Sequence, residues 1–262
     1  MRRQDEIRKP VVKLKTKSKY KIEIDDNYEF FKLNTKNKII SFFLYYIIGF
    51  LFGIIFLKIL NSHRIYGKEN IKELKNLGFI SIANHCHYLD MIMTASVFVY
   101  RMLWFTSAQR NFETPFLRKI LKIMNVFPIP DNSFGLNQIV KPVAELIENK
   151  QIVHLYPEQE IWHLSLDLGG FQNGAFYLSH KINCPLVPVV HLFKPKKFFG
   201  IKISKNLLTV KTIIGKPLYP KKNIEGEDGV VDMNLVNEMK NTARNWMIKQ
   251  IDEYKLENKK YF

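Results

Sequence analysis

The chain has 262 residues, of which 47% are hydrophobic, and its 40 Lys and Arg against 24 Asp and Glu give a formal net charge of +16. This length allows one large domain with its own core, and the apolar content excludes global disorder. The charge indicates an anionic partner, such as nucleic acid, anionic lipid or an acidic carrier protein. Two cysteines are too few for a disulfide framework and favour a reducing compartment.

The N-terminal quarter divides into a polar, Lys-rich segment at 1–38 and the most hydrophobic stretch of the chain at 39–60. About 19 residues from Ile39 onward contain no charge, enough to span a bilayer or to lie in one leaflet. We therefore expect a membrane-anchoring helix or helix pair at 39–60, flanked by basic residues that contact anionic lipid. A monotopic or re-entrant anchor would keep both flanks on the cytoplasmic face of the membrane.

Residues 61–262 alternate between strand-like apolar runs and helix-like segments, which predicts an α/β domain with a mixed, largely parallel sheet flanked by helices. Pro188 suggests that its strand is irregular or lies at an edge of the sheet. A polar stretch at 221–232 is expected to be a surface loop. The predicted strands are 79–83, 102–106, 126–129, 152–156, 186–193 and 206–214, and the predicted helices are 90–99, 114–124, 136–149, 170–182 and 233–256.

The turn between the first of these strands and the first helix contains His85 and Asp90. A carboxylate that binds one nitrogen of an imidazole leaves the other nitrogen free to accept a proton. The spacing His-x-x-x-x-Asp can supply this pair if the turn brings the two side chains together. Taken alone the spacing is a weak signal, because it arises often by chance.

Further segments with fixed order strengthen that signal. The strand at 152–156 is followed by Pro157-Glu158-Gln159-Glu160-Ile161, and Pro188 lies in a Val-Pro-Val strand. Together with Asn84, His85 and Asp90, these segments give the chain a resemblance to the glycerolipid acyltransferases of the 1-acyl-sn-glycerol-3-phosphate (lysophosphatidic acid) acyltransferase type. The family's corresponding blocks are Asn-His-x-x-x-x-Asp, Phe-Pro-Glu-Gly-Thr-Arg and Val-Pro-Val. The resemblance covers roughly residues 60–215 and describes a divergent member.

The resemblance implies a membrane-bound O-acyltransferase that moves a fatty acyl group from acyl-CoA or acyl carrier protein to a lysophospholipid or related lipid. His85 would be the general base and Asp90 would orient it. Asn84, Glu158 and Gln159 would belong to the substrate-binding part of the site. The reaction it implies needs no metal and no cofactor other than the thioester co-substrate. The implied partners are membrane lipids and an acyl carrier protein, and nucleic acid is not among them.

Several departures from the family's blocks remove cations. The second block commonly ends Phe-Ile-x-Arg, but 126–131 contains no arginine, and Ile161 replaces the arginine of the third block. The basic pair often found before the next Gly-Ala-Phe is Gln172-Asn173 here. Because those cations are expected to hold the phosphate of the acceptor, we expect an acceptor whose phosphomonoester is masked or absent. The side chains that could substitute for the missing cations are Arg110, His154, His163 and Lys194.

Other interpretations remain open at this level. A non-catalytic lipid-binding or scaffold protein on the same fold would explain the altered third block. The charge also permits nucleic-acid binding, although no recognisable motif supports it. His85, His87 and Asp90 do not have the spacing of a dinuclear metal site, and Cys86 could be a nucleophile but is expected to be inert.

Overall fold

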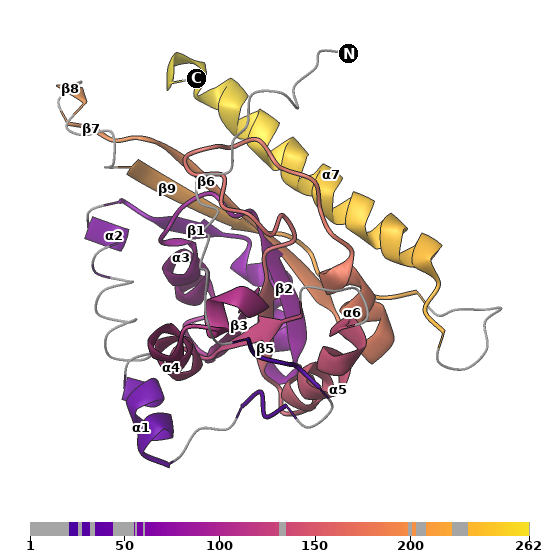
Figure 1. Cartoon of the computed structure of the whole chain (residues 1–262). Coiled ribbons are helices and arrows are strands. Elements are labelled where there is room, and N and C mark those ends of the chain that lie inside the picture. The colour runs from indigo at the N-terminus through magenta and orange to yellow at the C-terminus, as the bar shows by residue number, and fades with distance from the viewer. Residues whose placement is uncertain are drawn as a thin grey trace.

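The computed structural model describes residues 21–25, 28–31, 35–43, 55, 57–59, 61–130, 135–198, 201–202, 208–221 and 230–261 (Figure 1). Its main feature is a seven-stranded sheet in the order β1-β9-β6-β2-β5-β3-β4, beside a small β7–β8 ribbon. The strands are β1 (Arg64–Tyr66), β2 (Phe79–Ala83), β3 (Leu103–Ala108), β4 (Val126–Ile129), β5 (Ile152–Leu155), β6 (Leu186–Pro195), β7 (Lys197–Phe198), β8 (Ile201–Lys202) and β9 (Leu208–Ile214).

The five strands from β6 to β4 are parallel to one another, β9 is antiparallel to β6, and β1 is parallel to β9. The predicted α/β fold with a mixed, largely parallel sheet is therefore confirmed. The helices are α1 (Thr35–Phe43), α2 (Leu57–Ile59), α3 (Asp90–Val97), α4 (Pro115–Ile123), α5 (Gly135–Glu148), α6 (Gly174–Ile182) and α7 (Met233–Glu257), with shorter 3-10 helices η2 (Lys68–Asn76), η3 (Gln109–Phe112) and η4 (Lys259–Tyr261).

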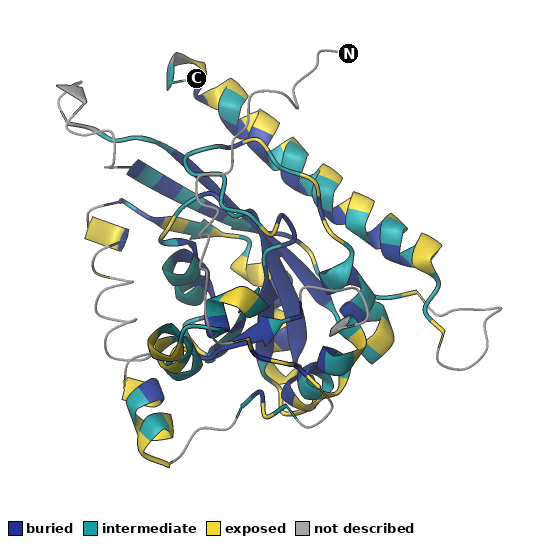
Figure 2. Ribbon diagram, in the orientation of Figure 1, coloured by how far each residue is buried: buried dark blue, intermediate teal, exposed yellow. Residues whose placement is uncertain are grey.

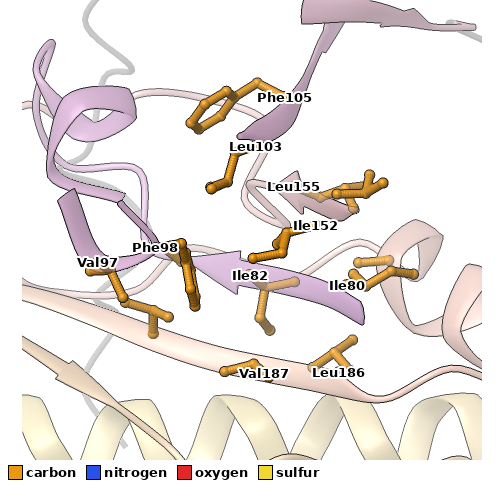
Figure 3. Packing of buried hydrophobic residues seen from close by; sticks show 14 of the residues in the cluster. Ile80, Ile82, Val97, Phe98, Leu103, Phe105, Ile152, Leu155, Leu186 and Val187 are labelled. Atoms are coloured by element: carbon orange, nitrogen blue, oxygen red, sulfur yellow. The ribbon is translucent and has the colours of Figure 1, made fainter. Parts of the chain in front are cut away.

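The core lies on both faces of the central strands. Every residue of β2 and β5 and the first eight residues of β6 are buried, as expected for parallel strands that helices cover on both sides. Figure 2 shows these strands in dark blue, with the exposed residues on the outer faces of the helices. Figure 3 shows Ile80 and Ile82 of β2 among apolar side chains from α3 and from strands β3, β5 and β6.

The connections between the parallel strands determine where a ligand can bind. The crossovers through α3 and α4 proceed toward β4, whereas those through α5 and α6 proceed the opposite way. Because such crossovers are right-handed, α3 and α4 cover one face and α5 and α6 the other (Figure 1). Adjacent strands β2 and β5 therefore lead to helices on opposite faces. In open α/β sheets, the crevice beyond the carboxyl ends of such a strand pair is where ligands bind.

Two of the sequence expectations are wrong. The strand that contains Pro188 lies between β2 and β9, inside the sheet. The strand tolerates a proline because β9 has already ended opposite it. The Pro188 carbonyl accepts the N–H of Gly215, one residue after β9, at 2.8 Å, so the N–H that proline lacks would face the same point beyond the end of β9. The helix predicted at 170–182 begins only at Gly174, because the chain before it returns to the third block, where the Gln172 N–H donates to the Pro157 carbonyl.

Most of the expected anchor at 39–60 lies outside the residues that the structure describes. The described parts of it are residues 39–43 in α1, residue 55, and residues 57–59 in α2. Within the described parts of the chain, no helix combines the length and the apolar composition needed to cross a bilayer. The Lys-rich segment up to residue 20 also lies outside the described residues, as does most of the loop predicted at 221–232.

Substitution of Gly78, the residue before β2, tests how closely the start of β2 packs against α5. A Cβ at this residue would lie 2.0 Å from the carbonyl oxygen of Ile147 in α5, and backbone atoms cannot give way as a flexible side chain can. We expect Gly78→Ala to lower the free energy of unfolding by about 1–3 kcal/mol. A Cβ at Gly170 meets no atom within 4 Å, so Gly170→Ala should change stability by less than about 0.5 kcal/mol. Urea unfolding of both variants checks this, and equal stabilities would contradict the packing described here.

Candidate active site

His85 and Asp90 meet at the carboxyl end of β2. Nδ1 of His85 lies 2.9 Å from Oδ2 of Asp90, and the same oxygen accepts the backbone N–H groups of Cys86 at 2.7 Å and His87 at 2.9 Å. An oxygen that already accepts two N–H groups acts as an acceptor, so Nδ1 of His85 donates to it and Nε2 is left unprotonated. The Asp90 side chain is 1% exposed and the His85 side chain 19%. The imidazole therefore has an orienting acid beneath it and an edge open to a substrate.

Glu158 follows the neighbouring strand β5 and joins the third block to the first. Its Oε1 accepts the backbone N–H of His85 at 3.0 Å, and its Oε2 accepts the backbone N–H of Gly169 at 2.6 Å. The residue is buried, and burial raises the pKa of its carboxyl, although the two backbone donors oppose this rise. A Cβ at Gly169 would lie 3.0 Å from Oε2 and 2.9 Å from Nε1 of Trp162, so a larger residue would displace one of these two side chains. Glu158 thus holds the backbone of His85 in place by a hydrogen bond.

The turn of the third block places two further side chains. The ring of Tyr156 stacks on the imidazole of His85, with centroids 4.1 Å apart and planes 14° apart. Gln159 is exposed and has a left-handed backbone with φ of 61°, and its N–H donates to the Tyr156 carbonyl. Such a φ favours glycine, the residue that the family pattern has at this point. The stacking on His85 could not be found from the sequence, because an aromatic residue at a strand end is usually core.

The predicted substrate-binding residues separate in the structure. Asn84 is buried, and its side chain exchanges two hydrogen bonds with the backbone of His191, at 2.9 and 2.7 Å, which link the end of β2 to the middle of β6. Arg110 is exposed on η3, at the carboxyl end of β3 and two strands away from β2. Glu158 bonds to the backbone of His85, whereas Gln159 is exposed and bonds to the Tyr156 carbonyl. Asn84 therefore has a positioning role in this fold, and Arg110 does not contact the His85 pair.

The other side chains considered as substitutes for the missing cations are also placed. Nζ of Lys194 donates to Oδ1 of Asn258 at 2.8 Å, away from the His85 pair. His154 is fully buried beneath Tyr156, and its Nδ1 bonds to the hydroxyl of Ser81. Burial lowers the pKa of His154 well below its usual value, so it is neutral and cannot serve as a cation. His163 lies near His87, with ring centroids 5.3 Å apart.

The alternative chemistries receive little support from this geometry. Cys86 is buried, and burial raises the pKa of its thiol well above the usual value, so it stays protonated and is a poor nucleophile. Nδ1 of His87 accepts the backbone N–H of Leu89 at 3.1 Å, as expected of a polar neighbour within the turn. In the described parts of the chain, no group of three or more His, Cys, Asp or Glu side chains could hold a metal ion.

A network of buried hydrogen-bonded side chains connects the sheet to α3. The hydroxyl of Thr212 lies 2.8 Å from Nε2 of His63 and 2.9 Å from Nδ1 of His191, and Nε2 of His191 lies 3.0 Å from the hydroxyl of Thr94 in α3. Burial lowers the pKa of both His63 and His191 to about 4. Both imidazoles are therefore neutral at physiological pH, and the threonine hydroxyls satisfy their nitrogens. The sequence offered no signal for this network.

Comparison with known proteins agrees with the site. A family model described as Acyltransferase matches residues 62–192, half of the chain, so the chain belongs to this family and the predicted enzyme class is confirmed. The match includes His85, Asp90 and Glu158 but ends before α7. No curated protein matches the chain. The crystal structure of the 1-acyl-sn-glycerophosphate (LPA) acyltransferase PlsC from Thermotoga maritima is similar, with 15% sequence identity, a TM-score of 0.49 and coverage of 82% of this chain and 96% of that chain.

The lowered pKa values of His63 and His191 predict how stability depends on pH. Unfolding returns both imidazoles to a pKa of about 6.5, so the unfolded chain binds more protons between about pH 6.5 and pH 4. The free energy of unfolding should therefore fall as the pH is lowered through this range. His191→Gln removes one of the two groups and should make the dependence shallower in chemical denaturation. Identical pH dependence in the variant and the wild type would show that His191 is not held neutral.

Proposed function

We propose that the protein is a membrane-bound O-acyltransferase that moves a fatty acyl group from a thioester to the hydroxyl of a lysophospholipid or related lysolipid. One observation carries this proposal: the 2.9 Å contact between His85 and Asp90, with the imidazole partly open, at the switch point of the sheet. Membership of the Acyltransferase family supplies the class of reaction. The acceptor, the donor and the membrane association belong to the proposal.

In this mechanism Nε2 of His85 takes the proton of the acceptor hydroxyl as its oxygen attacks the acyl carbonyl carbon. The C–O bond forms and the C–S bond breaks, and the proton passes from the imidazolium to the departing thiolate. The products are an ester and a free thiol, so atoms and charges balance. Asp90 holds the ring in one orientation and stabilises its protonated form during the reaction. Tyr156 fixes the plane of the ring by stacking on it.

The acceptor in this proposal does not present a free phosphomonoester. The third block ends in Ile161 where the family pattern has arginine, and the pair before Gly174 is Gln172-Asn173 in place of a basic pair. A doubly charged phosphate would need bidentate cationic partners at these positions. A phosphodiester head group or an amino-acid head group needs fewer cationic partners, because its anionic group carries a single charge. Lysophospholipids with masked phosphates and lyso-aminolipids therefore fit these residues better than lysophosphatidate does.

Association with a membrane is supported by an apolar surface formed by α1 and α4, which contact each other. The exposed side chains on this surface are large and apolar: Ile39, Phe42, Phe43, Phe116, Ile120 and Met124. Phe116, the most exposed of them at 77%, lies in the first turn of α4. The two helices also carry five basic residues, Lys36, Lys38, Arg118, Lys119 and Lys122, which suits an anionic lipid surface. We propose that this surface lies on the cytoplasmic face of the cell membrane.

The donor in this proposal is acyl-CoA or acyl carrier protein. Both carry the acyl group as a thioester and both are anionic, and the net charge of +16 suits either. The charge suits an acidic carrier protein slightly better, because a large basic surface steers association with a large acidic partner. A non-catalytic lipid-binding protein on the same fold is the alternative. It has no need of a base with an orienting acid, and for this reason we prefer the enzyme.

Replacing the proposed base tests the assignment. His85→Ala should lower the rate of acyl transfer by at least about 100-fold, because general-base catalysis typically contributes 10²–10⁴. His180→Ala is the matched control, since His180 lies on α6 and Nδ1 of its side chain bonds to the Phe176 carbonyl of the same helix. Transfer from radiolabelled acyl-CoA and acyl carrier protein is measured over lysophosphatidate, lysophosphatidylethanolamine, lysophosphatidylglycerol and a lyso-aminolipid. Unchanged turnover in His85→Ala would exclude the base, and a clear preference for lysophosphatidate would refute the proposed acceptor class.

The membrane surface is tested by Phe116→Ser. If Phe116 inserts into the bilayer, its loss should weaken binding to anionic vesicles by about 10-fold, since burying a phenylalanine contributes about 1.5–3 kcal/mol. Leu256→Ser on α7 is the control, because Leu256 is similarly exposed at 63% but lies on a different element. Vesicle co-sedimentation of the full chain measures both variants. Equal loss in the two variants would show that α4 has no special role at the membrane.

A further inference from the structure

A cavity of about 520 Å³ lies between α7 and the loop that follows the third block. Trp162, Asp167 and Gly169 line it from the loop, and Arg244, Asp252 and Lys255 line it from one face of α7. The volume is in the range of small-molecule sites. The mechanism described above makes no use of this cavity, and the α7 side of it lies beyond the residues that the family model matches.

The loop side of the cavity is bonded directly to the catalytic turn. The backbone N–H of Trp162 donates to the carbonyl of His85 at 2.8 Å. The backbone N–H of Gly169 donates to Glu158, whose other oxygen accepts the N–H of His85. A molecule in this cavity would therefore contact residues that bond to the backbone of the catalytic histidine.

Helix α7 brings two cations to the segment that lacks the family's basic residues. Nζ of Lys240 donates to Oδ1 of Asn173 at 2.6 Å, and Asn173 occupies one of the two positions where the family has its basic pair. One turn further along, Nε of Arg244 lies 3.4 Å from the carbonyl of Gly169, which leaves the two terminal guanidinium nitrogens available for an anion. Helix α7 thus supplies positive charge at Asn173, one position of the missing basic pair, and at Gly169 in the loop after the third block.

The other end of the cavity carries negative charge. Lys255 forms an ion pair with Asp167, whereas no ion pair among the described residues involves Asp252. Arg244 and Asp252 are eight residues apart, about 12 Å along the helix axis, and Ile248 and Ile251 line the cavity between them. The cavity therefore has a positive end near Glu158 and a negative end further along α7.

We propose that this cavity binds the head group of the acyl acceptor and that this head group is zwitterionic. Its anionic group, a phosphodiester or a carboxylate, contacts Arg244, and its ammonium group contacts Asp252. This inference rests on the proposed function and narrows its acceptor class. A lysophosphatidate has no ammonium group for Asp252, and a lysophosphatidylglycerol has the anion alone. Lysophosphatidylethanolamine and a lysolipid with an amino-acid head group have both charges.

Steady-state kinetics of the full chain in lipid vesicles tests the proposal with lysophosphatidylethanolamine, lysophosphatidylglycerol and an N-(hydroxyacyl) diamino-acid lysolipid, which keeps a free side-chain amine beside its carboxylate and offers its acyl-chain hydroxyl as the acceptor. Arg244→Gln should raise KM by about 10-fold or more for all three acceptors with a smaller effect on kcat, since a lost hydrogen bond to a charged group has about this effect. Arg244→Lys should recover part of the loss. Asp252→Asn should raise KM for the two zwitterionic acceptors and leave lysophosphatidylglycerol unchanged. The better of the two zwitterionic acceptors identifies the anion as a phosphodiester or a carboxylate.

The control is Lys249→Gln, which removes a charge from the same helix at a side chain that is 73% exposed and pairs with Glu253. It should behave as the wild type. If the wild type transfers an acyl group in a manner that depends on His85, but Arg244→Gln and Asp252→Asn match Lys249→Gln, the head-group site is wrong and the proposed function stands. If no acceptor is acylated at all, the proposed function itself fails.

Discussion

One oxygen atom of Asp90 determines the shape of the catalytic turn. It accepts two backbone N–H groups and the imidazole of His85 within 2.7–2.9 Å, and its side chain is almost completely buried. A buried carboxylate is costly unless it is well bonded, so the three donors cannot leave it without a large loss of stability. The chain from Cys86 to His87 must therefore wrap around Asp90, and this wrapping fixes the direction in which the ring of His85 points.

The second carboxylate, Glu158, extends this constraint to the neighbouring strand. It bonds to the backbone of His85 on one side and to Gly169 on the other, so the first and third blocks form one unit. The sheet topology places this unit where β2 and β5 lead to helices on opposite faces. Helix α7 then closes the loop side through Lys240 and Arg244. Two buried acids and a switch in connection direction thus determine the geometry of this candidate site.

Much of this arrangement could be predicted from local patterns. Short apolar runs marked β2, β4 and β5 within one residue of their observed bounds, because strands buried on both faces are continuously hydrophobic. The spacing of His85 and Asp90, together with the third block, predicted a pair of neighbouring side chains, and the structure brings the two together. The rule that proline avoids central strands failed at Pro188, because its missing N–H faces the place where the partner strand has ended.

The rest depends on contacts between residues far apart in the chain. The stacking of Tyr156 on His85, the close approach of Gly169 to Glu158 and the position of Arg244 involve pairs separated by 11 to 75 residues. No periodicity or spacing encodes such pairs. Asn84 was predicted to bind substrate because it lies beside His85 in the motif, and only the register of β2 against β6 shows that its amide holds His191.

The central claim is that Asp90 holds His85 with Nδ1 protonated and Nε2 free to accept a proton. The most direct measurement is ¹⁵N NMR of the His85 imidazole in the full chain at about pH 8, where a free imidazole is neutral, with the signals assigned by their absence in His85→Gln. The account predicts the shift of a protonated nitrogen at Nδ1 and of an unprotonated nitrogen at Nε2, and loss of this pattern in Asp90→Asn. A protonated Nε2 in the wild type, or the same spectrum in Asp90→Asn, would contradict it.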